Sequence, residues 1–206
     1  MKTICVILAG GRSRRMGRDK AALPLGAGTF LSRLVREYAP EFPVYVSVGE
    51  RGKFPLFGAG ELVDLHPGQG PLAGLEAAFR ETDAEGVFLT ATDLPFGTWA
   101  LARRLVENLG TADACVIRRR DGTPEPTFAV YRRSCLAAVE QCLREGRRSF
   151  RGMFDRMEVQ WIPEETLGDV SLERVLQNVN TPEEYEVARA AWKERESCCE
   201  VTTHRM

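Results

Sequence analysis

Short apolar runs alternate with helix-like segments along most of this 206-residue chain. Runs typical of strands lie at residues 4–8, 44–48, 62–64, 87–91, 112–117, 127–131 and 157–161, and helix-like stretches lie at 29–38, 72–80, 99–109, 134–144 and from 181 onward. Such alternation is typical of a mainly parallel sheet with helices packed on it. The strand-like runs are almost continuously apolar, which indicates burial on both faces. We therefore predict an α/β fold in which helices cover both faces of one central sheet.

Length and charge limit the classes of protein to which the chain can belong. Its size suits one α/β domain, which we place at residues 1–192, with 193–206 as a frayed C-terminal tail. The net charge is −1, and no apolar stretch approaches the ~20 residues of a membrane helix, so neither nucleic acid nor a membrane is expected as a partner. No secretory signal follows Met1, and we expect a cytoplasmic protein. The six cysteines include no C-x-x-C pair, so a zinc site is not expected.

The first strand-like run leads directly into a glycine-rich, basic loop. Paired glycines let the backbone approach a ligand closely, and inward-facing N–H groups suit phosphate oxygens. The loop matches neither G-x-x-x-x-G-K-[ST] nor G-x-G-x-x-G. A plain glycine turn before a solvated surface is the alternative, but it does not explain why a strand end, three glycines and five cations coincide. We assign the following residues of this loop to nucleotide binding: Leu8, Ala9, Gly10, Gly11, Gly17 and Lys20.

Asp93 follows the apolar run at residues 87–91 directly. In folds of this class, ligands bind beyond the carboxyl ends of the strands. A carboxylate placed there beside a triphosphate suits Mg²⁺, which prefers one or two carboxylates together with phosphate oxygens and water. The alternative is that Asp93 caps the following helix. On Asp93 alone the two interpretations are even, and the glycine-rich loop favours the metal.

A second loop, at residues 64–74, begins with Asp64 and ends with Gly74. Its glycines and prolines lead into a helix N-terminus, which is a natural place for a polar ligand. Asp64 could accept hydrogen bonds from a base with an amidine edge, such as guanine. The alternative is a simple turn between a strand and a helix, and His66 is interpreted as a loop residue rather than a catalytic base.

Two asparagines, Asn178 and Asn180, precede the last helix. Residues two apart project to the same side of an extended segment, so both could reach phosphate, metal or substrate hydroxyls. The alternative is a turn with Asn180 flanking the cap of that helix.

Together these motifs resemble the molybdenum cofactor guanylyltransferases, within the wider family of α/β nucleotidyltransferases. The resemblance implies a three-layer, Rossmann-like nucleotidyltransferase fold with a mainly parallel sheet. The Asn-Val-Asn-Thr-Pro-Glu segment and the basic Gly-Arg-Arg segment narrow the likeness to members that act on molybdopterin. The matching segments follow the expected order: Leu8–Gly11, Arg15–Gly17, Lys20, Pro71–Gly74, Thr92–Pro95, Pro126-Thr127, Gly146–Arg148 and Asn178–Glu183.

The resemblance implies that a terminal phosphate of molybdopterin attacks the α-phosphorus of GTP, so that pyrophosphate leaves and the guanine dinucleotide cofactor forms. It implies that Asp93 holds Mg²⁺, that Lys20 and Arg15 bind the triphosphate, and that Asp64 contacts the guanine edge. Gly10, Gly11, Gly17 and Gly74 would shape the nucleotide site, and Arg147, Arg148, Asn178 and Asn180 would face the pterin phosphate. Transient contact with cofactor-delivery proteins or apo-molybdoenzymes is also implied.

Three other functions remain open from the sequence. A cytidylyltransferase for the same cofactor would share most motifs, although such enzymes resemble Ala-Ala-Gly where this chain has Ala9-Gly10-Gly11. A sugar-1-phosphate or methylerythritol-type nucleotidyltransferase would share the first loop and Asp93 but not the Asn-Val-Asn-Thr-Pro segment. A non-catalytic nucleotide or pterin carrier would not need the carboxylate of Asp93.

Overall fold

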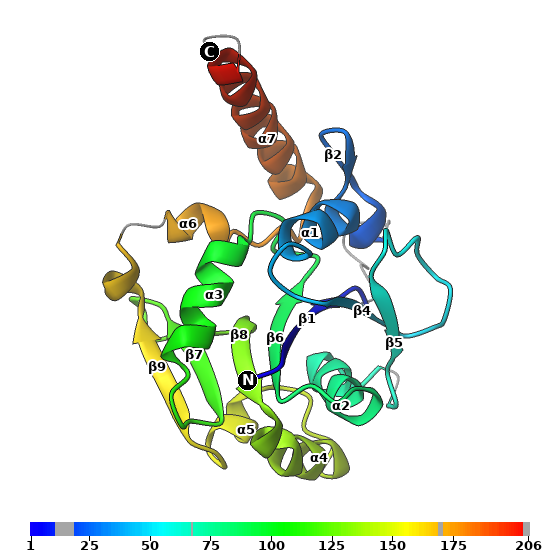
Figure 1. The fold of residues 1–206 in the computed structure, drawn as a ribbon, viewed down its shortest axis with the longest axis vertical. Coiled ribbons are helices and arrows are strands. Elements are labelled where there is room, and N and C mark those ends of the chain that lie inside the picture. The colour runs from blue at the N-terminus through cyan, green and yellow to red at the C-terminus, as the bar shows by residue number, and fades with distance from the viewer. Residues whose placement is uncertain (11–18, 67, 169–170, 204–206) are drawn as a thin grey trace.

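A seven-stranded sheet forms the centre of the computed structural model, which describes residues 1–10, 19–66, 68–168 and 171–203 (Figure 1). The strand order is β5-β4-β1-β6-β8-β7-β9, and all neighbouring pairs are parallel except those of β8 with β6 and β7. The predicted α/β fold with a mainly parallel sheet is therefore confirmed. The strands are β1 (Thr3–Leu8), β4 (Val44–Val48), β5 (Gly60–Val63), β6 (Gly86–Ala91), β7 (Ala114–Arg118), β8 (Pro124–Arg132) and β9 (Val159–Pro163).

Helices pack on both faces of the sheet, because side chains along each strand alternate between two apolar layers. In β1, Cys5 and Ile7 belong to one buried cluster, and Ile4 and Val6 belong to the other. The first cluster includes residues of α1 (Phe30–Tyr38), α3 (Trp99–Asn108) and α6 (Leu172–Val175). The second includes residues of α2 (Pro71–Glu81), α4 (Leu136–Arg144) and α5 (Arg151–Phe154).

The last helix, α7 (Pro182–Thr203), extends away from the rest of the molecule in Figure 1. It begins as the sequence predicts, because the Thr181 hydroxyl accepts from the Glu184 backbone N–H at 3.2 Å while Glu184 accepts from the backbone of Thr181 at 3.1 Å. This reciprocal pair is a capping box. The helix continues through most of segment 193–206, for which the sequence predicts a frayed tail.

Several features of the fold are absent from the predicted elements, among them the short helices α5 and α6. The short hairpin of β2 (Pro24–Leu25) and β3 (Gly28–Thr29) has two residues per strand, too few for a periodic pattern. The reversed direction of β8 follows from its close succession to β7, because a short turn can join only antiparallel neighbours.

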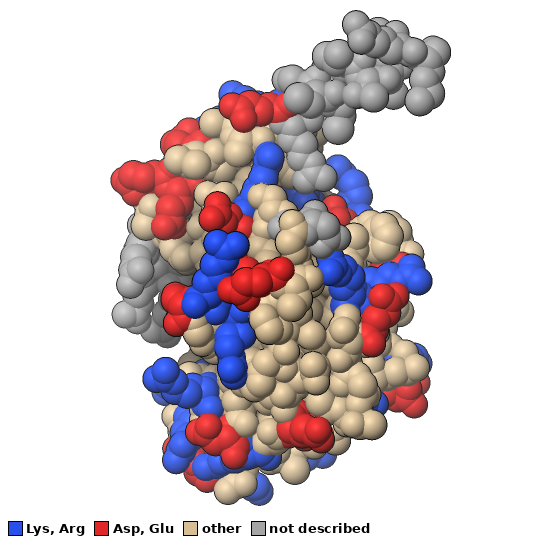
Figure 2. Space-filling model, turned by 90° about the vertical axis from the view of Figure 1, so that its left-hand side faces the viewer, with Lys and Arg blue, Asp and Glu red and all other residues tan. Residues whose placement is uncertain are grey.

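Surface charge agrees with the small net charge. Figure 2 shows the side of the molecule next to β9, where Lys and Arg side chains are interspersed with Asp and Glu. Within the residues that the structure describes, no helix is both long and apolar enough to cross a membrane.

Candidate functional site

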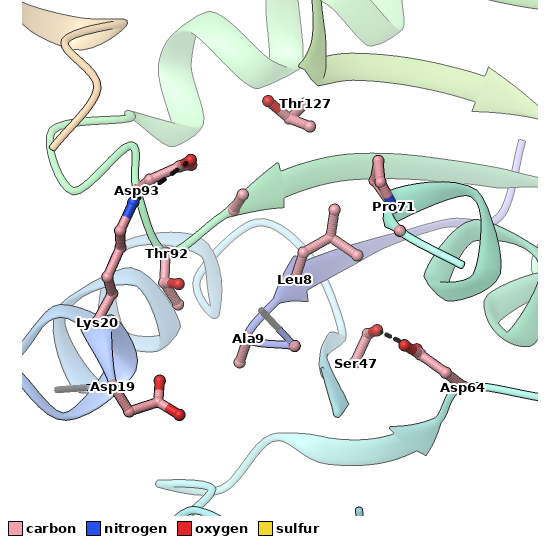
Figure 3. Close-up of a pocket in the computed structure, with 13 residues that line it drawn as sticks. Leu8, Ala9, Asp19, Lys20, Ser47, Asp64, Pro71, Thr92, Asp93 and Thr127 are labelled. Atoms are coloured by element: carbon pink, nitrogen blue, oxygen red, sulfur yellow. Dashed lines mark hydrogen bonds and ion pairs between the residues drawn. The ribbon is translucent and has the colours of Figure 1, made fainter. Parts of the chain in front are cut away.

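A cleft of about 310 Å³ opens at the carboxyl edge of the sheet. β1, β4, β5 and β6 all end here, so residues that follow these strands lie together although they are far apart in sequence. The first loop, the Asp64 loop and the Asp93 segment contribute to one cleft, as the sequence predicts. Figure 3 shows the residues that line it: Leu8, Ala9, Gly10, Asp19, Lys20, Ser47, Asp64, Gly70, Pro71, Ala91, Thr92, Asp93 and Thr127.

Asp93 and Lys20 lie together at one end of this cleft (Figure 3). Lys20 Nζ is 4.0 Å from Asp93 Oδ2 and 2.5 Å from Asn180 Oδ1. The segment of Asn180 is held here because the Val179 backbone N–H donates to the Asp93 carbonyl at 2.8 Å. The structure thus brings together the end of the first loop, the Asp93 segment and the segment of Asn180.

The Asp93 carboxylate is poised to bind a ligand. Its Oδ1 is buried without a hydrogen-bond partner in the described residues, and burial raises the pKa of Asp93, which the nearby Lys20 ammonium partly offsets. A buried oxygen without a partner costs free energy unless a ligand satisfies it. The helix-cap alternative for Asp93 is wrong, because Thr98 caps α3 by accepting from the Leu101 backbone N–H.

The residues present fit a magnesium ion that shares its ligands with phosphate. No group of three His, Cys, Asp or Glu side chains that could hold a metal occurs in the described parts of the chain. Magnesium does not need such a group, because it binds through one or two carboxylates together with phosphate oxygens and water. The unpaired Asp93 Oδ1 supplies that kind of ligand.

Asp64 lies at the other end of the cleft beside Ser47 (Figure 3). The Ser47 hydroxyl donates to Asp64 Oδ1 at 2.8 Å. Burial raises the pKa of Asp64 above its ordinary value of 3.8, and the Ser47 hydrogen bond opposes this shift. The other oxygen, Oδ2, lies 3.6 Å from the place where a Cβ on Gly10 would stand. Asp64 therefore faces the start of the glycine-rich loop.

Gly74 is not among the residues that line the cleft. A Cβ there would stand 2.5 Å from Leu8 Cδ2 and 2.6 Å from Ser47 Oγ. The glycine thus lets α2 pack closely against β1 and β4. Its contact with Ser47 connects this packing to the position of Asp64.

The predicted pterin-facing residues do not all reach the cleft. Arg148 adjoins it, because its carbonyl oxygen lies 3.2 Å from a Cβ built on the lining residue Gly70. Arg147 is exposed and its Nε pairs with Glu145 at 2.9 Å. Asn178 is exposed, whereas its neighbour Asn180 contacts Lys20.

Three predicted residues, Gly11, Arg15 and Gly17, lie outside the described residues. The sequence reasoning gave no site role to seven residues that line the cleft, namely Asp19, Ser47, Gly70, Pro71, Ala91, Thr92 and Thr127. Ser47 gave a signal that could have been used, since it is a polar residue near the carboxyl end of an otherwise apolar run, β4.

This geometry suits the transfer of a nucleotidyl group. A carboxylate stands ready to accept hydrogen bonds at one end of the cleft, and a lysine and a second carboxylate lie at the other. The family model of the MobA-like NTP transferase domain matches residues 5–160. The chain belongs to the MobA-like NTP transferase family. Two relatives of this NTP transferase extend the match over nearly the whole chain, and the predicted resemblance is confirmed.

A probable molybdenum cofactor guanylyltransferase from Carboxydothermus hydrogenoformans is 36% identical over 87% of this chain and 91% of its own length. The molybdenum cofactor guanylyltransferase of Desulfosudis oleivorans is 31% identical over 91% of this chain and 95% of its own.

Solved structures confirm the nucleotidyltransferase fold of this MobA-like chain. The molybdopterin-guanine dinucleotide biosynthesis protein A of Archaeoglobus fulgidus superposes with a TM-score of 0.80 and 25% identity, over 92% of this chain and 98% of that protein. CMP:2-keto-3-deoxy-manno-octonic acid synthetase, solved with CTP, gives a TM-score of 0.73 at 15% identity, over 95% of this chain and 100% of that protein. The second likeness concerns the fold alone.

Proposed function

We propose that this chain transfers GMP from GTP to the terminal phosphate of molybdopterin. An oxygen of the acceptor phosphate forms a bond to the α-phosphorus of GTP, and the bond from that phosphorus to the bridging oxygen of the β-phosphate breaks. The products are pyrophosphate and the guanine dinucleotide form of the cofactor. The observation that carries this proposal is that two carboxylates, Asp64 and Asp93, lie at opposite ends of one cleft in a chain of this family.

The base end of the site is Asp64 with Ser47. Guanine presents two adjacent donors, N1–H and the N2 amino group, and a carboxylate can accept from both. The Ser47 hydroxyl at 2.8 Å fixes the orientation of Asp64 and favours its ionised form. Neither cytosine nor adenine offers this pair of donors on one edge, so the arrangement favours GTP over CTP and ATP.

The phosphate end of the site is Lys20 with Asp93. Lys20 supplies positive charge to the triphosphate, with Asn180 and Asp93 holding its ammonium group in place. Asp93 would hold the magnesium ion, which would supply positive charge to neutralise the charge that develops during transfer. Phosphoryl and nucleotidyl transfers depend mainly on such positioning and charge stabilisation. Arg15 is assigned to the triphosphate by the family resemblance alone.

The acceptor end is assigned to Asn178, Asn180, Arg148 and Arg147. Asn180 is supported by its contact with Lys20, and Arg148 by its place beside Gly70. Arg147 has weaker support, since it already pairs with Glu145. Contact with delivery proteins or apo-molybdoenzymes would follow from the product, which has to reach an enzyme that uses it.

Pyrophosphate release tests this proposal directly. The purified chain is mixed with Mg²⁺, molybdopterin and either GTP, CTP or ATP, and a parallel panel replaces molybdopterin with sugar phosphates and methylerythritol phosphate. We expect pyrophosphate release only in the mixture that contains both GTP and molybdopterin. Turnover with CTP would indicate the cytidylyltransferase, turnover with another acceptor would indicate a different nucleotidyltransferase, and binding without turnover would indicate a carrier.

A further inference from the structure

β8 departs from regular strand pairing where it reaches the cleft. Val116 of β7 pairs with Ala129, but the next pair is Arg118 with Pro124, so Glu125–Phe128 oppose Ile117 alone. Bulges of this kind redirect side chains and are common beside active sites. Here the bulge is held by the Tyr131 hydroxyl, which donates to the Pro126 carbonyl at 2.8 Å. It brings Thr127 into the cleft lining (Figure 3).

Glu125 belongs to the same bulge as Thr127. Glu125 Oε1 lies 3.1 Å from Arg119 Nε, and both side chains are largely buried, with 14% and 22% of their surfaces exposed. Burial raises the pKa of Glu125, the Arg119 guanidinium opposes this shift, and the Asp93 carboxylate adds to it. Arg119 is thus held at the start of the turn that follows β7, at the carboxyl end of that strand.

The strand order places the residues assigned to the guanine and the Glu125–Arg119 pair in different halves of the sheet. Asp64 and Ser47 belong to the half of the sheet formed by β5, β4 and β1, whereas Asp93 follows the central strand β6. The half beyond β6, with β8 and β7, contributes Thr127 to the cleft and carries the Glu125–Arg119 pair. If the guanine occupies the first half and the α-phosphate lies near Asp93, the second half flanks the α-phosphate on the side opposite the guanine.

We propose that Arg119, positioned by Glu125, binds the phosphate of the acceptor. This inference rests on the proposed function, since it concerns the second substrate of that reaction. A guanidinium has five N–H donors, and one carboxylate leaves several of them for a phosphate. Its planar fork matches phosphate oxygens with two parallel hydrogen bonds. Glu125 holds the guanidinium in place and would limit the rotamer entropy lost on binding.

The neighbouring cations are less suited to this role. Arg118 lies over the ring of Trp161, with its Cζ 4.1 Å from the ring centroid. The side chain of Arg120 is 75% exposed and its Nε faces Glu165 at 3.9 Å. Arg119, in contrast, pairs with Glu125, a residue of the same bulge that contributes Thr127 to the cleft.

Steady-state kinetics with each substrate varied in turn tests the inference. Arg119→Gln is compared with wild type and with Arg120→Gln, a matched change in the same turn. We expect Arg119→Gln to raise KM for molybdopterin, or to lower kcat/KM for it, by about ten- to hundredfold, the size of one charge-assisted contact. The affinity for GTP, measured by titration calorimetry, should stay within about twofold of wild type, and Arg120→Gln should leave both quantities unchanged.

The positioning role of Glu125 is tested in the same assay. Glu125→Gln should raise KM for molybdopterin without changing GTP affinity, and Glu125→Gln combined with Arg119→Gln should be little worse than Arg119→Gln alone, because both act through one contact. Additive effects of the two changes would show that Glu125 does not act through Arg119, because a merely structural residue would add an independent loss of its own. Arg119→Lys should recover part of the acceptor affinity because it restores the charge.

Failure of the inference and failure of the proposed function give different results. Wild type without turnover of GTP and molybdopterin would overturn the proposed function itself. If wild type turns over GTP and molybdopterin, and Arg119→Gln has the same KM and kcat/KM for molybdopterin as Arg120→Gln, the inference alone is overturned. An equal loss of GTP affinity and molybdopterin affinity in a folded Arg119→Gln protein, with the fold checked by circular dichroism, would also overturn it.

Discussion

Lys20 Nζ lies 2.5 Å from Asn180 Oδ1, although the two residues are 160 positions apart in the sequence. This contact connects the part of the cleft that follows β1 to the segment that precedes α7. Because the same ammonium group is 4.0 Å from Asp93, one side chain connects the predicted triphosphate, metal and acceptor parts of the site. Changes at Lys20 should therefore affect ligand binding more than they affect the fold.

Lys20→Ala should weaken GTP binding by about ten- to hundredfold, because a charge-assisted hydrogen bond contributes ~1.5–3 kcal/mol. Titration calorimetry measures the affinity. Lys2→Ala is the matched control, since Lys2 pairs with Asp83 at an exposed position before β1 and away from the cleft. Equal GTP affinity in Lys20→Ala and wild type would show that the triphosphate binds elsewhere.

Asp64→Ala should reduce the preference for GTP more than it reduces turnover. The guanine donors would lose their acceptor, so GTP should lose much of its advantage over ATP and CTP in kcat/KM. Competition assays with the three nucleotides measure this ratio. An unchanged ratio in the variant would remove Asp64 from base recognition.

GTP binding should weaken as the pH falls through the pKa of Asp64. Burial raises this pKa above 3.8, and only the ionised carboxylate can accept both guanine hydrogen bonds. Ser47→Ala removes the hydrogen bond that lowers the pKa, so affinity in this variant should begin to decline at a higher pH. Calorimetric titrations between about pH 4.5 and 8 cover the range in which a shifted carboxyl titrates. Superimposable pH profiles for wild type and Ser47→Ala would contradict this prediction.

Asp93→Asn should abolish magnesium-dependent turnover while the protein stays folded. Asparagine keeps the shape of the side chain but loses the charge that a metal needs. Burial raises the pKa of Asp93, so its ionised form opposes folding above that pKa, and the amide removes this cost. We therefore expect the Tm without ligands at neutral pH to equal or exceed that of wild type. Near-normal activity of Asp93→Asn at saturating Mg²⁺ would show that Asp93 does not hold a metal that turnover requires.

Gly74→Ala should destabilise the protein by about 1–3 kcal/mol, because the added methyl group overpacks a close helix–strand contact. Leu8 and Ser47 would have to move, since their atoms lie within 2.6 Å of the new Cβ. Displacement of Ser47 should also reduce the selectivity for GTP. Gly168→Ala is the control, since its Cβ would meet the Glu165 carbonyl oxygen at an ordinary 3.6 Å. Urea unfolding measures the stability, and equal midpoints for the two variants would argue against the predicted clash.

The sequence by itself determined the class of fold and the edge of the sheet at which the site lies. Alternating apolar runs and helices predict a parallel sheet, and residues directly after the strands must then meet at its carboxyl edge. Gly10, Asp64 and Asp93 could be assigned in this way because each follows a strand within a few residues. Local periodicity and chain direction are sufficient for that inference.

Only the tertiary structure decided which side chains become partners within the site. The Ser47–Asp64 and Lys20–Asn180 contacts depend on the order in which strands and helices pack, and no local pattern specifies that order. The reversal and bulge of β8, which bring Thr127 to the cleft, depend likewise on its pairing between β6 and β7. Strand order is set by the burial of two apolar layers across the whole sheet, a property that emerges when distant segments pack together.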